Sequence, residues 1–284
     1  MAARTLEDWV DSLQARGRYT FRRAEANAES GLSAEAVKKA LQRLVGRGRV
    51  AKAKHYFYVI VPLEYRTAGA PPPSWFIHDL MEAMQLPYYV GLLSAAALHG
   101  AAHQQPQEFQ VVTDRSVRPL VVGRARIRFF SSKDLAGTAV TSMKTPTGSM
   151  RVSTPEATVM DLVRFARAAG SLDNVLTVLS ELSPHLVPQR LLRVARQRND
   201  MPNAQRLGYL LDRLRAKTLA RSIHDWVVRR RPRPVSLRPG RASRGAVEDQ
   251  RWHVLLSEPI ELGSPSVPSI DPAWRGQGNC GGFQ

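Results

Sequence analysis

Hydrophobic side chains near the N-terminus recur at the three- and four-residue intervals of amphipathic helices. The pattern predicts helices over residues 5–16, 20–29 and 33–46. Thr20 and Ser33 can cap the second and third helices, because a hydroxyl at that position accepts a hydrogen bond from an unpaired backbone amide. Two apolar runs that also carry basic residues follow, RVAKA and HYFYVIVP, and they predict paired strands around a tight turn.

The rest of the pattern predicts a mixed domain followed by helices. Helices are expected over residues 75–84 and 88–102, and short strands are expected in EFQVVTD, PLVVGR, ARIRFFS and SMRVS. The run TPEATVMDLVRFARAAG predicts another helix, and residues 171–228 are expected to be helical throughout. The sequence RWHVLLSEPIEL predicts a late strand.

Together these elements predict an α+β chain that begins with a winged helix-turn-helix over residues 5–62. Three helices followed by a hairpin within about 60 residues is the element order of that motif. The Pro- and Gly-rich segment 63–74 indicates a linker. The further expected parts are a mixed α/β core with a helical extension at 75–228, a basic Pro-rich segment with a returning strand at 229–262, and a disordered tail at 263–284.

The distribution of charge along the chain indicates a class of binding partner. The chain has a formal net charge of +17. Residues 1–62 hold 12 Lys and Arg against 6 Asp and Glu, and residues 190–244 hold 16 against 3. Residues 63–189 are almost neutral, with 11 against 10. Solubility alone would not require two separate basic zones, so the partition favours a polyanionic partner, most often nucleic acid.

Several other classes of protein are disfavoured by the composition. The one cysteine, Cys280, can form neither a disulfide framework nor a thiolate zinc site. No run approaches the ~20 apolar residues of a membrane span, and the N-terminal sequence carries acids where a signal peptide is apolar. We therefore expect a cytoplasmic protein without a membrane partner. His99 and His103 lie four residues apart, but no further ligand accompanies them, so no metal or cofactor is expected.

Enzyme motifs are also missing from the sequence. It contains no phosphate loop, no dinucleotide fingerprint and no nucleophile elbow. Asp114 ends the predicted strand EFQVVTD, but the Glu-x-Lys of a restriction-type nuclease does not follow it. Glu156 lies in a helix start typical of a capping box, and no motif supports a catalytic role for it or for Asp161. The expected protein is not an enzyme.

The third predicted helix has an outward face suited to the major groove of DNA. If its apolar residues pack inward, that face carries Lys38, Lys39, Gln42 and Arg43. Glutamine can pair with adenine, and arginine or lysine can contact guanine or phosphate. Glu35 on the same face is a counter-signal. A small basic helical domain that docks a protein remains the alternative.

Basic residues around the predicted hairpin extend this candidate site. Those that we expect to meet phosphates or the minor groove are Arg49, Lys52, Lys54 and His55. Arg22 and Arg23 can hold the DNA backbone, and Ser33 can donate to a phosphate as well as cap its helix.

A possible second basic surface lies near the C-terminus. Its members are Arg190, Arg193, Arg196, Arg198, Arg229, Arg230 and Arg231. The candidate ligands are nucleic acid and an acidic protein. A solvated helix face followed by a flexible basic loop is the simpler interpretation.

Several strings of the sequence together resemble one protein family. They are PYYVGLLSAAALHGAAHQQPQEFQVVT, RVSTPEATVMDLV, RLGYLLDRL and RWHVLL, which follow the winged-helix segment. They are similar to the AbiEi-type antitoxins of bacterial toxin–antitoxin and abortive-infection systems, from about residue 5 to about residue 260. YYVGLLSAAALHG and STPEATVMDL are the most specific of these strings.

The resemblance implies a protein with two roles. The N-terminal winged helix would bind repeats in the double-stranded DNA of its own promoter and repress the operon. The C-terminal region would neutralise a co-encoded nucleotidyltransferase-type toxin, in the type IV manner that counters the toxin's effect without a stable complex. The alternatives are a stand-alone transcription factor with a ligand-sensing or dimerising C-terminal region, and a nuclease or toxin-modifying enzyme in residues 80–230. The sequence predicts no oligomeric state and no operator sequence.

Overall fold

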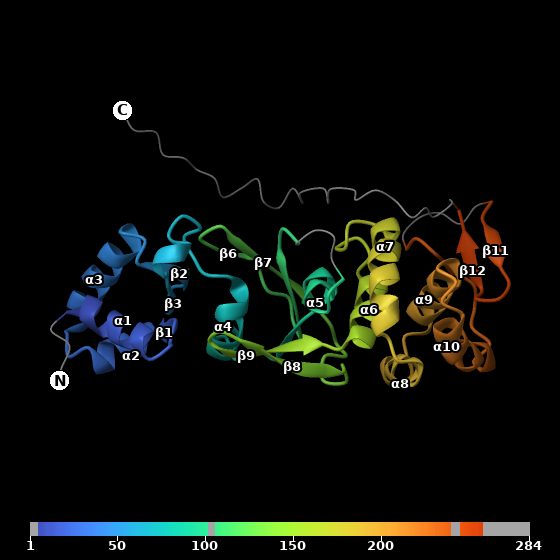
Figure 1. The fold of residues 1–284 in the computed structure, drawn as a ribbon, viewed down its shortest axis with the longest axis horizontal. Helices are drawn as coiled ribbons and strands as arrows, with labels where there is room; N and C mark the ends of the chain where they lie inside the picture. The colour runs from blue at the N-terminus through green and yellow to red at the C-terminus, as the bar shows by residue number, and fades with distance from the viewer. Residues whose placement is uncertain (1–4, 102–105, 240–244, 258–284) are drawn as a thin grey trace, which may run out of the picture. The chain divides into compact units, whose positions relative to one another are not determined.

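The computed structural model describes residues 5–101, 106–239 and 245–257 (Figure 1). These residues divide into two compact units. The first contains the described residues up to Thr158 together with Arg196–Arg198, and the second contains the remainder. Helices and strands occur in both units, which confirms the predicted α+β class. His103, Cys280 and the expected tail at 263–284 lie outside the described residues.

Six elements open the first unit. They are α1 (Leu6–Ala15), β1 (Thr20–Arg22), α2 (Arg23–Glu29), α3 (Ala34–Gly46), β2 (Val50–Lys54) and β3 (Phe57–Ile60). The strands form an antiparallel sheet in the order β1-β3-β2. The three helices pack on one face of this sheet around buried Leu13, Phe21, Val37 and Leu41.

The helix predicted over residues 20–29 is wrong at its start. Residues 20–22 form β1, whose Phe21 is buried and stacks on Tyr58 of β3. Thr20 caps no helix, because its hydroxyl donates instead to the carboxylate of Asp79. A strand of three residues is too short to show its period in the sequence, so the pairing with β3 decides the conformation.

Strand β3 of the hairpin is buried on both faces. Tyr58 and Ile60 belong to the hydrophobic cluster under the three helices. Phe57 and Val59 belong to a second cluster, which continues into the central sheet of the same unit. A strand covered on both sides has no solvent face to mark with polar residues, which explains the unbroken apolar run YFYVIV.

The segment 63–74, expected to be a linker, lies inside the first unit. It contains two 3₁₀ turns, Leu63–Tyr65 and Pro73–Trp75. Its Ala70 is 4% exposed and belongs to the second cluster. The backbone N–H of Arg124 donates to the carbonyl of Ala68 at 2.7 Å, so the segment is fixed to the central sheet.

The central sheet has six strands in the order β6-β7-β5-β4-β9-β8. Their bounds are β4 (Tyr88–Val90), β5 (Phe109–Thr113), β6 (Leu120–Val122), β7 (Ala125–Ser131), β8 (Val140–Thr145) and β9 (Gly148–Ser153). β5 pairs parallel with β7 and β4 parallel with β9, and the other neighbours are antiparallel. Helix α4 (Ile77–Ala83) contacts β9, and helix α5 (Leu92–Leu98) contacts β5.

One prediction is wrong in this sheet, and one of its strands was not predicted. The helix expected over 88–102 begins only at Leu92, because Tyr88–Val90 is the buried strand β4. A short, fully apolar run can be a buried strand or a helix, and the sequence pattern does not separate the two. β8 was not predicted, since this edge strand is largely polar and lacks an apolar run.

Helices dominate the chain after the central sheet. They are α6 (Pro155–Arg164), α7 (Leu172–Leu182), α8 (Pro188–Arg198), α9 (Met201–Arg213) and α10 (Lys217–Arg229). This agrees with the helical character predicted for 171–228, with short breaks between the helices. The second unit ends in a small sheet of order β10-β12-β11, formed by β10 (Val235–Ser236), β11 (Val247–Asp249) and β12 (Val254–Leu256). The late strand predicted in RWHVLLSEPIEL is β12.

Trp252 holds this small sheet on α9. Its side chain is buried, and a Cβ built on Gly208 of α9 would lie 2.1 Å from its Cζ3 atom. The indole N–H donates to Asp212 Oδ2 at 2.6 Å, and the Gln205 amide donates to the Trp252 carbonyl at 3.1 Å. The strings RLGYLLDRL and RWHVLL therefore meet in the fold.

Gly208→Ala is expected to lower the free energy of unfolding by about 1–3 kcal/mol, because the added methyl group overlaps the Trp252 ring. Thermal unfolding followed by circular dichroism measures the change. Gly46→Ala is the matched control, since nothing lies within 4 Å of a Cβ at the exposed end of α3, and we expect no loss of stability and a gain of up to about 1 kcal/mol from the lower backbone entropy of alanine. Equal destabilisation of the two variants would contradict the packing of Trp252 on Gly208.

Candidate nucleic-acid interface

The helix α3 is oriented by its apolar side. Val37, Leu41 and Leu44 are buried against the other N-terminal elements. The Ser33 hydroxyl accepts a hydrogen bond from the Ala36 amide at 3.3 Å, so Ser33 is the N-cap that the sequence predicts. Its 13 residues make a helix about 20 Å long, enough to cross a DNA groove.

The opposite side of α3 is exposed and basic. It carries Lys38, Lys39, Gln42 and Arg43, all four of them exposed. Glu35 lies 3.9 Å from Lys38, but both side chains are more than half exposed, and such a pair contributes little. Among the described residues, no carboxylate pairs with Lys39 or Arg43. This face is therefore free to contact a polyanion.

The tip of the β2–β3 hairpin gathers a second group of basic residues. The Arg23 amide donates to the Tyr56 carbonyl at 2.9 Å, which places the tip at the start of α2. Arg22 and His55 are exposed there, while Arg23 and Lys54 are half-buried. Lys52, one residue before the bulge in β2, is also exposed.

Near this tip, Tyr58 of β3 is buried in the hydrophobic cluster under the three helices. Burial raises the pKa of the Tyr58 hydroxyl, and the nearby charge of Arg23 partly opposes that rise. Tyr58 therefore stays protonated at neutral pH and serves as packing under the tip.

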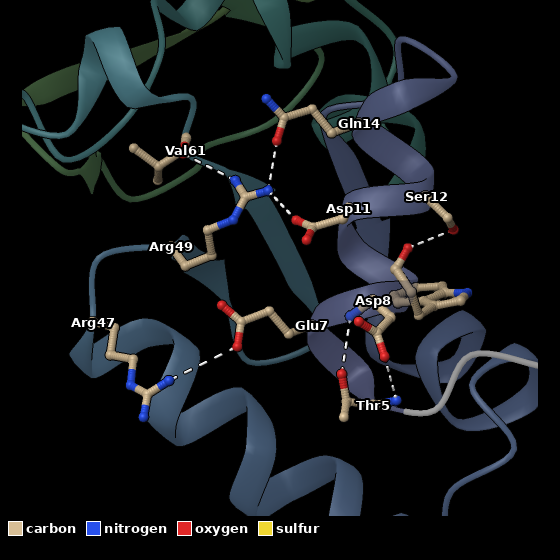
Figure 2. Close-up of polar contacts among 10 residues, drawn as sticks. Thr5, Glu7, Asp8, Asp11, Ser12, Gln14, Arg47, Arg49 and Val61 are labelled. Atoms are coloured by element: carbon tan, nitrogen blue, oxygen red, sulfur yellow. Dashed lines mark hydrogen bonds and ion pairs between the residues drawn. The ribbon is translucent and has the colours of Figure 1, made fainter.

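Arg49 differs from the other basic residues of this group (Figure 2). Its Nη2 atom donates to Asp11 Oδ1 at 2.5 Å and to Gln14 Oε1 at 2.6 Å, and its Nη1 atom donates to the Val61 carbonyl at 3.3 Å. The side chain is 14% exposed. Arg49 thus ties α1 to the end of β3, and its guanidinium is occupied within the fold. The expectation that it reaches DNA phosphates does not fit this geometry.

The sequence interpretation missed the two partners of Arg49. Asp11 and Gln14 lie three positions apart on α1, on the same side of the helix. Only that spacing could have indicated a shared ligand, and nothing in the sequence pointed to Arg49. Nearby, Glu7 pairs with Arg47 at 3.8 Å.

The possible second basic surface divides in the structure. Arg190, Arg193 and Arg196 are exposed on α8, and Arg229, Arg230 and Arg231 are exposed at the end of α10. Arg198 is 8% exposed and donates to the Thr138 hydroxyl at 3.4 Å, so assigning it to a surface was wrong. Arg198 lies on the apolar side of α8, whereas Arg190, Arg193 and Arg196 lie on its polar side.

The residues considered for other chemistry also have contacts within the fold. The Asp114 carboxylate accepts from Arg115 at 3.0 and 3.1 Å, and this hydrogen bonding lowers its pKa. Glu156 and Asp161 are buried in α6. His99 follows α5 with its Nε2 atom 2.7 Å from the Ser153 carbonyl oxygen. Across the described residues, no group of three or more His, Cys, Asp or Glu side chains is placed to hold a metal.

No helix in the described part of the chain has the length and apolar character needed to cross a membrane.

Comparison with known proteins adds a family and a fold. Residues 89–213 match the family model of the AbiEi antitoxin C-terminal domain, which confirms the family resemblance of that region. The crystal structure of the RV2827C protein from Mycobacterium tuberculosis is similar, with a TM-score of 0.63 at 15% identity over 88% of this chain and 90% of that chain. At this identity the likeness shows a shared fold. Among curated proteins, none matches the sequence.

Arg49→Ala is expected to lower the free energy of unfolding by about 1–3 kcal/mol, because it removes a half-buried charged donor from three acceptors. Chemical denaturation measures the loss. Lys52→Ala, in the same basic run but exposed, should change stability by no more than about 0.5 kcal/mol. If both variants unfolded at the same denaturant concentration, the separation of Arg49 from the binding residues would be wrong.

Proposed function

Because residues 89–213 match the AbiEi antitoxin C-terminal domain, which supports an antitoxin role in a toxin–antitoxin system, we propose a more specific function for the whole chain. Its N-terminal elements act as a winged helix-turn-helix that binds double-stranded DNA in the chain's own promoter and represses the operon. The chain also counteracts a co-encoded nucleotidyltransferase-type toxin, and it does so without catalysing a reaction.

The exposed face of α3 is the observation that carries the DNA-binding part. It offers two lysines, one arginine and one glutamine on a helix whose other side is anchored in a core. Gln42 would read a base edge, since a glutamine amide can donate to and accept from adenine at once. Lys38, Lys39 and Arg43 would bind phosphate or guanine.

The hairpin tip would fix the position of the protein on the duplex. Arg22, Arg23, Lys52, Lys54 and His55 are near phosphates in this proposal, and such contacts set register without reading sequence. We leave Arg49 out of the contact set, because its hydrogen bonds go to α1 and to Val61, the residue after β3.

The antitoxin part rests on the family match. The matched residues begin in β4 and end with α9, so they include most of the central sheet and the first helices of the second unit. A growth assay tests this part: induction of the co-encoded toxin should arrest growth, and co-expression of this chain should restore it. A chain with Lys38→Ala, Lys39→Ala and Gln42→Ala should still restore growth if neutralisation does not depend on DNA reading.

The decisive experiment on DNA binding is a gel shift at ~150 mM salt, where non-specific binding is weak. DNA upstream of the gene should be bound in preference to unrelated DNA. The variant Lys38→Ala, Lys39→Ala, Gln42→Ala should lose that preference. Gln107→Ala, Lys133→Ala, Lys144→Ala removes the same residue types from exposed positions of the central domain and should bind as the unaltered chain does. Equal binding of both DNAs by the unaltered chain would refute sequence reading by α3.

Single substitutions separate reading from positioning. Gln42→Ala should cost about 1–3 kcal/mol of discrimination at one base pair and leave other positions unchanged. Lys38→Ala or Arg43→Ala should weaken binding to all sequences similarly and reduce the salt slope by about 1. Binding measured across salt concentrations and single-base operator variants tests both statements. Identical behaviour of the three variants would rule out the division of roles.

A further inference from the structure

The carboxylates of the second unit are mostly turned into its fold. Asp173 pairs with Arg238 at 3.0 Å, and Asp200 accepts from the Asn203 amide at 3.3 Å as the N-cap of α9. Asp212 and Asp249 both accept from Trp252, and Glu248 lies 3.0 Å from His253. Among the described acids of this unit, Asp225 alone is exposed, with a side chain 75% accessible. It lies on α10, four residues from Arg221 and four from Arg229, so one carboxylate shares the open side of that helix.

The cations of α10 point the other way. Leu219, Ile223 and Trp226 are on the buried side of this helix. Six exposed cations belong to this helix and the segment after it. Arg230 lies over the Trp226 ring at 5.9 Å, and we call the other five the cationic ridge: Lys217, Arg221, Arg229, Arg231 and Arg233. Within residues 159–195, 199–239 and 245–257, no carboxylate forms an ion pair with any of the five. The helical part alone extends over about 18 Å.

The backbone that carries the end of the ridge is fixed. The Arg231 amide donates to the Val228 carbonyl at 3.0 Å. The buried Gln205 amide, 1% exposed, donates to the Arg233 carbonyl at 3.0 Å, and the same nitrogen lies 3.1 Å from the Trp252 and His253 carbonyls. The flexible basic loop considered for this region does not describe residues 229–239. Cations on a fixed backbone lose less conformational entropy when they bind a ligand.

We propose that the cationic ridge binds the sugar-phosphate backbone of nucleic acid at a site separate from α3. Guanidinium groups match phosphate oxygens through paired N–H donors, and a row of them fits a ligand whose charges repeat at short intervals. In duplex DNA each strand presents one phosphate per ~3.4 Å along the axis, so the helical ridge spans several phosphates. Contacts of this kind carry no base readout.

An acidic protein is the competing class of ligand, and the composition of the ridge disfavours it. The centres of protein–protein interfaces are enriched in aromatic and other apolar side chains and depleted of charge. Among the described residues of α10, Val228 is the one large apolar residue that is exposed. Interfaces with nucleic acid are, by contrast, strongly positive and polar.

Fluorescence anisotropy on the full chain tests the proposal. The background protein carries Lys38→Ala, Lys39→Ala and Gln42→Ala, which removes reading by α3. It is titrated at ~50 to 200 mM salt with a random-sequence DNA duplex and with an RNA hairpin of similar charge. Adding Arg221→Gln, Arg229→Gln and Arg231→Gln should weaken binding and reduce the slope of log K against log salt by about 3, one unit for each lost phosphate contact. Whichever probe shows the larger loss identifies the source of the phosphates.

Arg118→Gln, Lys133→Gln, Lys144→Gln is the matched control in the same background. It removes the same formal charge from exposed positions of the first unit, and the slope should stay nearly unchanged. Equal slope losses in both triple variants, no binding of either nucleic acid by the background protein, or tighter binding of poly-glutamate than of nucleic acid would each overturn the proposal. Circular dichroism melts confirm that the exposed substitutions leave the fold intact. Because the operator test uses an intact ridge and this test lacks α3 reading, either proposal can fail alone.

Discussion

Burial of strand β3 on both faces is the constraint on which the first unit depends. One face closes the core under α1, α2 and α3, and the other face joins the core of the central sheet. Arg49 adds a polar tie, from α1 to the end of β3. The direction in which α3 presents its basic side is therefore set by the central domain as well as by its own three-helix core.

The sequence predicts the elements whose apolar periodicity is long enough to be read. Helices α1 and α3 and the hairpin fall close to their predicted positions, and the α+β class is confirmed. The family resemblance is confirmed for residues 89–213. β1 and β4 are missed because each adjoins an apolar pattern that predicts one helix, and their strand conformation comes from partners far away in the chain. Arg49 and Lys52 lie in the same basic run, so charge pattern cannot separate them. Their burial and hydrogen-bond partners do, and the same holds for Arg198 against Arg196.

The second unit shows how a recognisable region can depend on residues beyond it. The family match ends at Arg213, the last residue of α9. Trp252 lies well past that point, yet its ring fills the space above Gly208 and its indole binds Asp212. The absence of a Cβ at Gly208 and the position of β12 are thus parts of one arrangement. The segment between them, with its row of arginines, is held at both ends.

The folded state of residues 63–74 bears on how such a protein can evolve. If the N-terminal elements bind DNA as proposed, exchange of that module at a flexible joint would be a simple route to a new specificity. Here the joint carries buried Ala70, and Tyr65 and Trp75 meet edge to face at 5.3 Å. An N-terminal module taken from another protein would also have to supply apolar partners for the central sheet. We therefore expect natural selection to change the exposed side chains of α3 while its backbone is retained. The N-terminal elements and the central sheet are expected to be inherited together.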